Sequence, residues 1–423
     1  MPSITLLFIV FVLVATLFAM GSWRHGIFCI IVVAAFQDPI RKTTPGVPAY
    51  FVLSMIPIFM GVVLCLMQKR SGWLKSFVNR ETRIILPLRL LAAWLLVPAM
   101  IGVGNYGMGG LKLAILGLLF YGVGLLAIVV GYHGGADRRF IRRICAFFAL
   151  VTAMMISGVM LEVRGVYPDW LALGTEAMNM HWIRYIPGRI IEMQSGFYRS
   201  PDVMGWHALV GSLLALTLAF STRNQGARVF WMLLAAWMLL GVFYCGRRKF
   251  FYLLPIFTAA WMWSKRRRAA SMAVSLFSLA AVGGFFVMFI LPSSGMNEDI
   301  AHYYVSTVGD TTERLRGGGL EGVLVTFRQR GIFGGGLGSA STGAHRIAGL
   351  GEGTGNWQES GTSRLALELG LPGLLLAIWL FWRIFVRSNR LAASFGTRQI
   401  LPDQLYVGLF ALTISNAACF FVS

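Results

Sequence analysis

The chain has 423 residues, of which 57% are hydrophobic and only 13% are charged, and its formal net charge is +20. A soluble domain carries about 25% charged residues, so this composition argues against a large soluble helical protein. The positive charge does not indicate nucleic-acid binding, because most basic residues lie in short loops between apolar runs.

Apolar runs of the length needed to cross a membrane recur from end to end and predict an all-α, polytopic transmembrane helix bundle of about 11–12 spans. The first run has no basic segment before it and no small-residue cleavage site after it, so we interpret it as a retained span. The five cysteines lie in or beside apolar runs and are interpreted as buried apolar residues. The expected spans are 4–21, 48–67, 84–103, 110–132, 141–161, 204–220, 229–245, 250–264, 270–292, 364–386 and 404–422.

A shorter apolar run at 26–37 ends at Gln37-Asp38-Pro39 and leaves two alternatives open. It is either a twelfth span, which places the N-terminus outside, or a half-span that enters and leaves on one side, which places it inside. The sequence alone does not choose between them.

The distribution of charge predicts the orientation of the bundle. Five basic clusters fall on one side of the predicted spans, which by the positive-inside rule is the cytoplasm. The other side carries two long loops, 162–203 and 293–363. We therefore expect a single integral membrane domain, 1–423, with its active-site side on these outer loops. The loops hold twelve of the 17 carboxylates, namely Glu162, Asp169, Glu176, Glu192, Asp202, Glu298, Asp299, Asp310, Glu313, Glu321, Glu352 and Glu359.

A run of three cations, Arg247-Arg248-Lys249, lies in a very short turn on the outer side, against the usual charge bias. One interpretation is an anion site, because the planar guanidinium of arginine binds phosphate oxygens in bidentate fashion. The other is that the side chains extend to phosphates of the outer leaflet. A second basic group, Arg184, Arg189 and Arg199, lies in loop 162–203, where the chain re-enters the membrane sharply and Arg199 is expected at the interface.

The longer outer loop contains Arg328 and Arg330, followed by a glycine-rich stretch to Gly338. Such a stretch either wraps phosphate with its backbone N–H groups or forms simple turns, and it lacks the Lys-Ser/Thr of a nucleotide loop. Farther on, Glu359 leads directly into a span and is a candidate general base. Glu321 and His345 are second candidates, and no ligand spacing indicates a metal or another cofactor.

Three segments, in this order, resemble motifs of the O-antigen ligase/polymerase superfamily of bacterial membrane glycosyltransferases. The segment 195–205 is similar to the family's re-entry motif, with Asp202 in place of an asparagine. The turn 246–248 is similar to its S-R-G turn, whose arginine is functional. The stretches 330–338 and 359–373 are similar to P-x-F-G-x-G-x-G and to a His-Asn pair followed by E-L-G-x-P-G. The resemblance covers roughly residues 110–390.

Two departures from the family pattern bear on the site. The family's arginine before the first glycine falls on Met193, so that Arg189 or Arg199 would have to replace it. The family's histidine falls on Glu359, whose carboxylate can still accept a proton.

The resemblance implies a C-type glycosyltransferase-like fold and metal-independent chemistry at the periplasmic face of the bacterial inner membrane. Donor and acceptor would be glycans on undecaprenyl diphosphate, with a flippase and a chain-length regulator as further partners. In this interpretation Arg247, Arg248 and Glu359 are catalytic, and Arg189, Arg199, Arg328 and Arg330 bind the diphosphate. The leading hypothesis is a polymerase of exopolysaccharide or O-antigen repeat units. The alternatives are a ligase acting on lipid A core or protein, a lipid-glycan or solute transporter, and a non-catalytic assembly factor.

Overall fold

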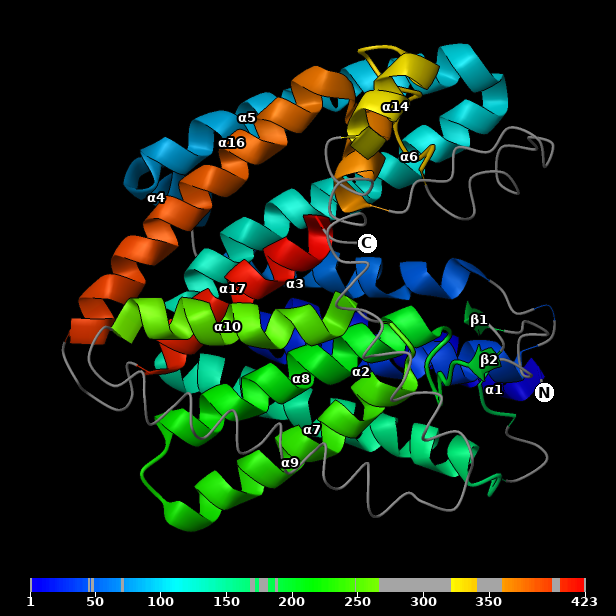
Figure 1. The fold of residues 1–423 in the computed structure, drawn as a ribbon. Coiled ribbons are helices and arrows are strands. Elements are labelled where there is room, and N and C mark those ends of the chain that lie inside the picture. Colours follow the sequence, from blue (N-terminus) through cyan, green and yellow to red (C-terminus); the bar gives the residue numbers. More distant parts are fainter. Residues whose placement is uncertain are drawn as a thin grey trace. The chain divides into compact units, whose positions relative to one another are not determined.

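The described part of the chain is all-α apart from one small β-hairpin, as in a helical membrane protein (Figure 1). Among the residues described, seven helical stretches are long and apolar enough to cross a membrane, which confirms the predicted polytopic helix bundle. The predicted span 270–292 lies outside these residues. The computed structural model describes residues 2–44, 46, 49–69, 72–167, 172–174, 182–186, 189–247, 249–265, 321–340, 360–397 and 404–421. The seven stretches are Ile4–Gly21, Tyr50–Lys69, Thr82–Gly135, Arg138–Val163, Pro201–Ser221, Gln225–Tyr244 and Gly361–Ser394.

The described chain divides into two compact units. The first unit contains the N-terminal helices, a central group of antiparallel helices and most of the short apolar helix α17 (Gln404–Phe421). Its other elements are α1 (Pro2–Gly21), α2 (Trp23–Thr43), η1 (Ala49–Ser54), nearly all of α3 (Met55–Lys69), α7 (Arg138–Val163), β1 (Ile183–Ile186), β2 (Arg189–Glu192), α8 (Pro201–Ser221), α9 (Gln225–Tyr244) and α10 (Lys249–Lys265).

Helix α8 is the core of the first unit, and nearly all of it is buried. Its start is fixed locally, since Ser200 accepts a hydrogen bond from Val203 N at 3.4 Å and Pro201 occupies the first helical position. Small residues let its neighbours approach closely. A Cβ on Gly211 would meet Met238 of α9 at 2.6 Å and Thr152 of α7 at 3.0 Å.

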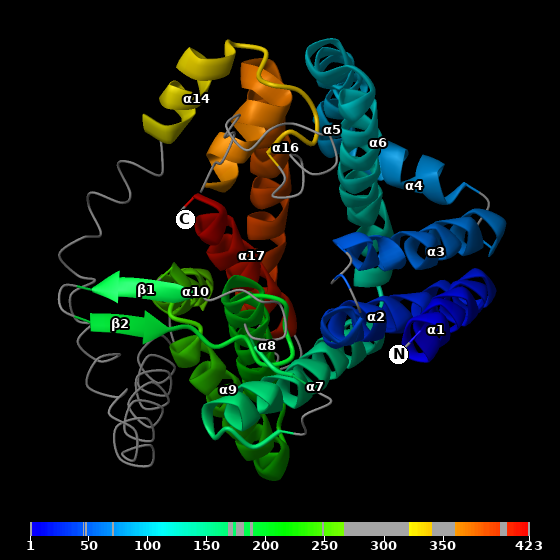
Figure 2. The same ribbon diagram turned by 90° about the vertical axis from the view of Figure 1, so that its right-hand side faces the viewer.

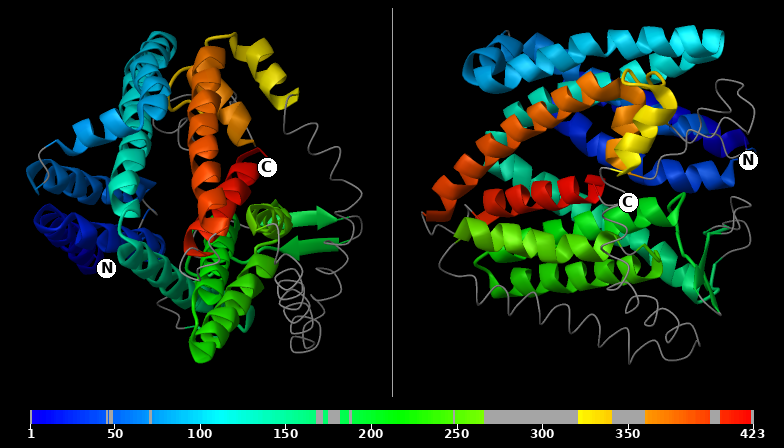
Figure 3. Two further views of the ribbon diagram at one scale, coloured as in Figure 1. Left: turned by 90° about the vertical axis from the view of Figure 1, so that its left-hand side faces the viewer. Right: turned by 45° about the horizontal axis from the view of Figure 1, so that its top comes forward.

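Helices α1 and α2 lie side by side and run in opposite directions (Figure 3). Thr5 Oγ1 and Thr44 Oγ1, near the start of one and the end of the other, are 3.1 Å apart. Helix α2 continues through Gln37, Asp38 and Pro39 to Thr43, and its 21 residues span about 31 Å. This length would suffice to cross a membrane, but α2 is not among the seven stretches that are also apolar enough, so the two sequence alternatives stay open.

Charged residues of the first unit gather at its two ends. At the end that we call the Arg223 end, Arg24 of α2 pairs with Asp137 before α7 at 2.9 Å. Arg138, Arg139, Arg228 and Lys265 also lie in helix turns at this end. The opposite end, the Arg199 end, holds Asp38, Glu162 and Asp202 near the ends of α2, α7 and α8. The Arg199 end also holds the cations Lys42, Arg199, Arg247 and Lys249, so carboxylates are concentrated at this end whereas basic residues lie at both ends.

The hairpin β1–β2 also lies at the Arg199 end (Figure 2), and the sequence analysis did not predict it. Its strands pair in antiparallel register, with Ile186 opposite Arg189 and Ile183 opposite Glu192. A two-residue Pro-Gly step at 187–188 separates the strands in the sequence, and such a step between β-favouring residues is a hairpin signal.

The second unit contains α4 (Trp73–Arg80), α5 (Thr82–Trp94), α6 (Leu96–Gly135), α14 (Gly322–Arg330) and most of α16 (Gly361–Thr397). Helix α6 reverses at Gly107, whose backbone has φ 56° and ψ −131°. Gly110 then packs against Gly102 so closely that a Cβ has no room. This reversal separates the two predicted spans 84–103 and 110–132.

Candidate functional site

A group of cations surrounds the start of α8 at the Arg199 end of the first unit. Arg247 Nη2 lies 2.6 Å from Asp202 Oδ2, and Lys249 Nζ lies 3.1 Å from Asp202 Oδ1. Asp202 thus bridges two cations that the sequence places in a different turn. The side chains of Arg247 and Lys249 are 20% and 25% exposed. Because the N-terminus of a helix favours negative charge, this arrangement is suited to bind an anion.

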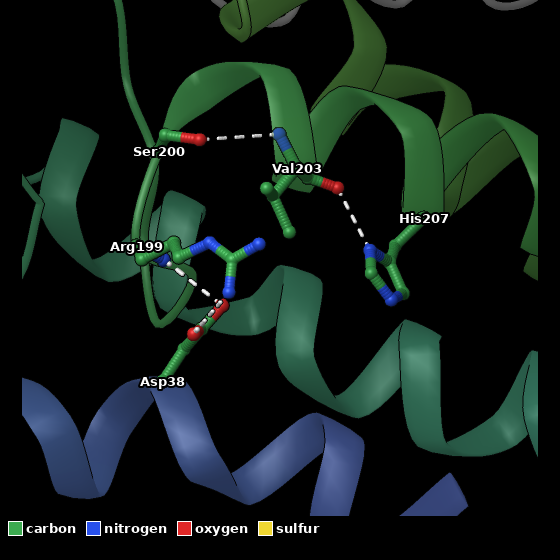
Figure 4. A network of polar contacts seen from close by, with 5 residues as sticks. All are labelled: Asp38, Arg199, Ser200, Val203 and His207. Atoms are coloured by element: carbon green, nitrogen blue, oxygen red, sulfur yellow. Dashed lines mark hydrogen bonds and ion pairs between the residues drawn. The ribbon is translucent and has the colours of Figure 1, made fainter. Parts of the chain in front are cut away.

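Arg199 lies directly before α8 and is held by a carboxylate from α2 (Figure 4). Its backbone N–H donates to Asp38 Oδ2 at 3.2 Å, and its Nη1 lies 3.7 Å from Asp38 Oδ1. The Asp38 side chain is 3% exposed, whereas that of Arg199 is 31% exposed. One edge of the guanidinium is therefore anchored, and the rest of it stays accessible beside the first turn of α8.

The turn that precedes Arg199 is fixed by two further charged residues. Glu162 Oε2, from the end of α7, accepts hydrogen bonds from Ser195 N at 3.1 Å and Gly196 N at 2.6 Å. Lys42 Nζ, from the last turn of α2, donates to Gly196 O at 2.6 Å. Gly196 has φ +52°, and a Cβ there would lie 2.5 Å from Val159 N, so the position requires glycine.

The turn between α9 and α10 packs on the same segment. Gln194 N donates to Tyr244 O at 3.0 Å, and Met193 contacts Gly246, which has φ +61°. Met193 is buried, so this chain has an apolar contact at the position where the family pattern has an arginine. The Cys245 thiol is fully buried and donates to Val242 O at 2.9 Å, so we interpret it as a structural group.

The structure thus brings two of the predicted site residues, Arg199 and Arg247, to one helix start. Arg189 is the first residue of β2, in the segment of the chain that leads to Arg199. Arg328, Arg330 and Glu321 belong to α14 and the residue before it, in the second unit, where all three are exposed. Arg248, His345 and Glu359 lie outside the described residues.

The glycine-rich stretch after α14 packs against helices of the second unit. Gly335 N donates to Leu367 O at 2.7 Å, and Leu337 N donates to Pro98 O at 3.1 Å. Leu371 N donates to Ile332 O at 2.7 Å, where α16 bends at Gly370 with φ 68°. These backbone N–H groups are engaged by protein carbonyls, which favours the interpretation of this stretch as packed turns.

A carboxylate on α16 secures the end of this stretch. Glu368 Oε1 accepts a hydrogen bond from Ala340 N at 3.1 Å, and Glu368 Oε2 accepts one from the Tyr121 hydroxyl at 2.7 Å. Helix α16 begins at Gly361, immediately after the segment that contains Glu359, and Ser360 Oγ accepts from Ser363 N at 3.1 Å. The predicted position of Glu359 directly before a span is therefore consistent with the start of this helix.

Sequence reasoning missed Asp38, Lys42 and Glu162 as members of the site. The available signal was the polar break at 37–42 within an apolar run, because charges in such a run are costly unless they are paired. Within the described residues, no group of three or more His, Cys, Asp or Glu side chains gathers as metal ligands do. No protein-family model and no curated protein sequence matches the chain.

Proposed function

We propose that the chain is a glycosyltransferase that joins oligosaccharide repeat units carried on undecaprenyl diphosphate. The observation that carries this proposal is the group of Arg199, Arg247 and Lys249 around the N-terminus of α8, at one end of an apolar helix bundle. A lipid-linked diphosphate would place its negative charge at this end of the bundle. Its lipid would lie beside the apolar helices, and its glycan would extend into water.

The arrangement supports a direct displacement. The hydroxyl oxygen of the acceptor sugar attacks the anomeric carbon of the donor, and the bond from that carbon to the diphosphate oxygen breaks. Negative charge develops on the departing diphosphate, and fixed cations at its position lower the free energy of that transition state. Arg247 is suited to this role because its guanidinium forms two parallel hydrogen bonds to phosphate oxygens.

The proton of the attacking hydroxyl needs an acceptor, and Glu359 is our proposed base. Its place directly before an apolar run and the similarity of 359–373 to the family pattern support this role, which is proposed from the sequence alone. Arg248, which lies between two members of the cation group in the sequence, is proposed as a further contributor of positive charge.

The proposed location is the bacterial inner membrane, with the Arg199 end facing the periplasm. The basic residues of the Arg223 end support this orientation, since such residues favour the cytoplasmic side. The large apolar side chains exposed along α1, including Leu7 and Leu17, support contact with lipid. A bundle of about 11–12 spans and delivery of the substrate by a flippase belong to the same proposal.

The experiment uses the purified full-length protein in lipid nanodiscs with undecaprenyl-diphosphate-linked repeat units. We expect products with two or more joined units and release of one undecaprenyl diphosphate for each bond formed. Transfer only to an added lipid A core oligosaccharide would make the protein a ligase with the same donor site. Donor that stays intact both with and without the lipid A core oligosaccharide would contradict the proposal.

A further inference from the structure

Three charged residues on the two helices that flank the turn 195–199 hold that turn from opposite sides. Glu162 binds the N–H groups of Ser195 and Gly196, and Lys42 binds the carbonyl oxygen of Gly196. Asp38 binds both the backbone N–H and the guanidinium of Arg199. The backbone before Arg199 and the side chain of Arg199 are therefore fixed together.

The contacts of Lys42 are buried and those of Glu162 and Asp38 are partly buried, which restricts their geometry. Asp38 is 2% exposed, Lys42 is 8% exposed and Ser195 is fully buried. A buried charge is strongly unfavourable unless its partners satisfy it in good geometry. The left-handed backbone at Gly196 and its close approach to Val159 leave the turn little freedom to adjust if one partner is lost.

The same two helices are joined differently at the Arg223 end. There Arg24 of α2 pairs side chain to side chain with Asp137 before α7, and both groups are at least one-third exposed. That pair connects helices. At the Arg199 end, Lys42 donates to the hydroxyl of Ser195 and to the carbonyl oxygen of Gly196, and Glu162 accepts from the backbone N–H groups of both residues. The turn that presents Arg199 is thus what these charges hold.

We propose that Asp38, Lys42 and Glu162 are positioning residues, which fix the turn 195–199 so that the exposed edge of Arg199 binds the diphosphate of the lipid-linked donor. This inference rests on the proposed function and assigns a role in donor binding to the N-terminal helix α2. None of the three residues touches the reacting atoms in this account, because each acts through the turn or through Arg199.

The direction in which one substitution changes the affinity for an anion distinguishes positioning from simple electrostatics. Asp38→Asn removes a negative charge next to Arg199, so electrostatics alone would tighten anion binding. If Asp38 positions Arg199, the same substitution weakens binding, because the amide cannot accept from the backbone N–H and also hold the guanidinium as an ion pair. Glu162→Gln gives a second test on the other side of the turn, where one carboxylate oxygen accepts two N–H groups.

The measurement is the Kd of a short-chain polyprenyl diphosphate for the purified full chain, with the uncharged polyprenol as the reference for lipid binding. We expect Asp38→Asn and Glu162→Gln to weaken diphosphate binding about tenfold or more, with unchanged polyprenol binding. The matched control is Asp137→Asn, which weakens the ion pair between the same elements at the other end and keeps a capping side chain. Its Kd should equal that of the wild type.

Thermal unfolding of every variant distinguishes loss of the turn from loss of the fold. The inference predicts that Asp38→Asn lowers Tm more than Asp137→Asn does, because Asp38 is buried, but that both variants stay folded at the assay temperature and only Asp38→Asn loses diphosphate affinity. Equal or tighter binding by Asp38→Asn and Glu162→Gln, together with weaker binding by Arg247→Ala, would overturn the inference alone. Failure of the wild type to prefer the diphosphate over the polyprenol would overturn the proposed function and this inference with it.

Discussion

At the scale of single residues, Asp202 and Asp38 hold their arginines in different ways. Asp202 is 32% exposed and pairs through its side chain with those of Arg247 and Lys249, whereas Asp38 is buried and also binds backbone. A phosphate group that binds Arg247 and Lys249 must therefore compete with the Asp202 carboxylate. Asp202 acts in this account as an internal counter-ion that keeps the product diphosphate from binding too tightly.

Replacement of Asp202 by asparagine tests this role with almost no change of shape. We expect Asp202→Asn to lower the Kd of a polyprenyl diphosphate by a few-fold, about the effect of removing one competing charge at a partly exposed site. Turnover should fall, because release of the product diphosphate slows. Titration of the product analogue and steady-state kinetics measure the two effects. A higher Kd would instead mean that Asp202 orients the cations.

At the scale of elements, the sequence predicts helices well where apolar runs end at strong local signals. The end of α8 nearest the site is set by Ser200 and Pro201, and the reversal of α6 by Gly107. The hairpin β1–β2 escaped prediction because its strands have four residues each, too few for a clear alternation of apolar side chains. The glycine-rich stretch was ambiguous because its partners, α6 and α16, are distant in the sequence.

The contact between Tyr121 and Glu368 gives a prediction for this packed stretch. Tyr121→Phe removes the hydroxyl that donates to Glu368 Oε2 and leaves a partly buried carboxylate oxygen without that partner. We expect the free energy of unfolding to fall by about 1–3 kcal/mol. Thermal unfolding in nanodiscs measures the change. Tyr50→Phe is the control. Because Tyr50 is 61% exposed, the Tm of this variant should equal that of the wild type. Equal Tm values for both variants would contradict the role of this contact.

At the scale of the whole molecule, the proposed membrane orientation rests on the distribution of charge, and it can be measured directly. Val166 follows α7 at the Arg199 end and is 62% exposed, and Arg223 is exposed in the turn between α8 and α9. In a cysteine-free background, Val166→Cys should react with a membrane-impermeant thiol reagent in intact spheroplasts. Arg223→Cys should react only after permeabilisation. The reverse pattern would contradict the proposed orientation.

The site itself was only partly predictable from the sequence. Arg247 stands out because cations on the predicted outer side oppose the usual charge bias, and Arg199 because it lies where the chain is predicted to re-enter the membrane sharply. No such signal marks Asp38, Lys42 and Glu162. They lie on α2 and α7 and contact a turn that is more than 30 residues away from either helix in the sequence. Such pairings depend on how helices pack, which periodicity and local motifs do not specify.

The central claim is that the cations at the start of α8 stabilise a departing diphosphate, and Arg247→Ala tests it most directly. The matched variant is Arg223→Ala, which removes an exposed arginine from the opposite end of α8. We expect Arg247→Ala to lower kcat/KM for joining lipid-linked repeat units by about 100-fold or more, as the loss of one fixed charge-stabilising group does in other enzymes. Arg223→Ala should retain wild-type kinetics. Equal activity of the two variants at equal protein levels would contradict the account.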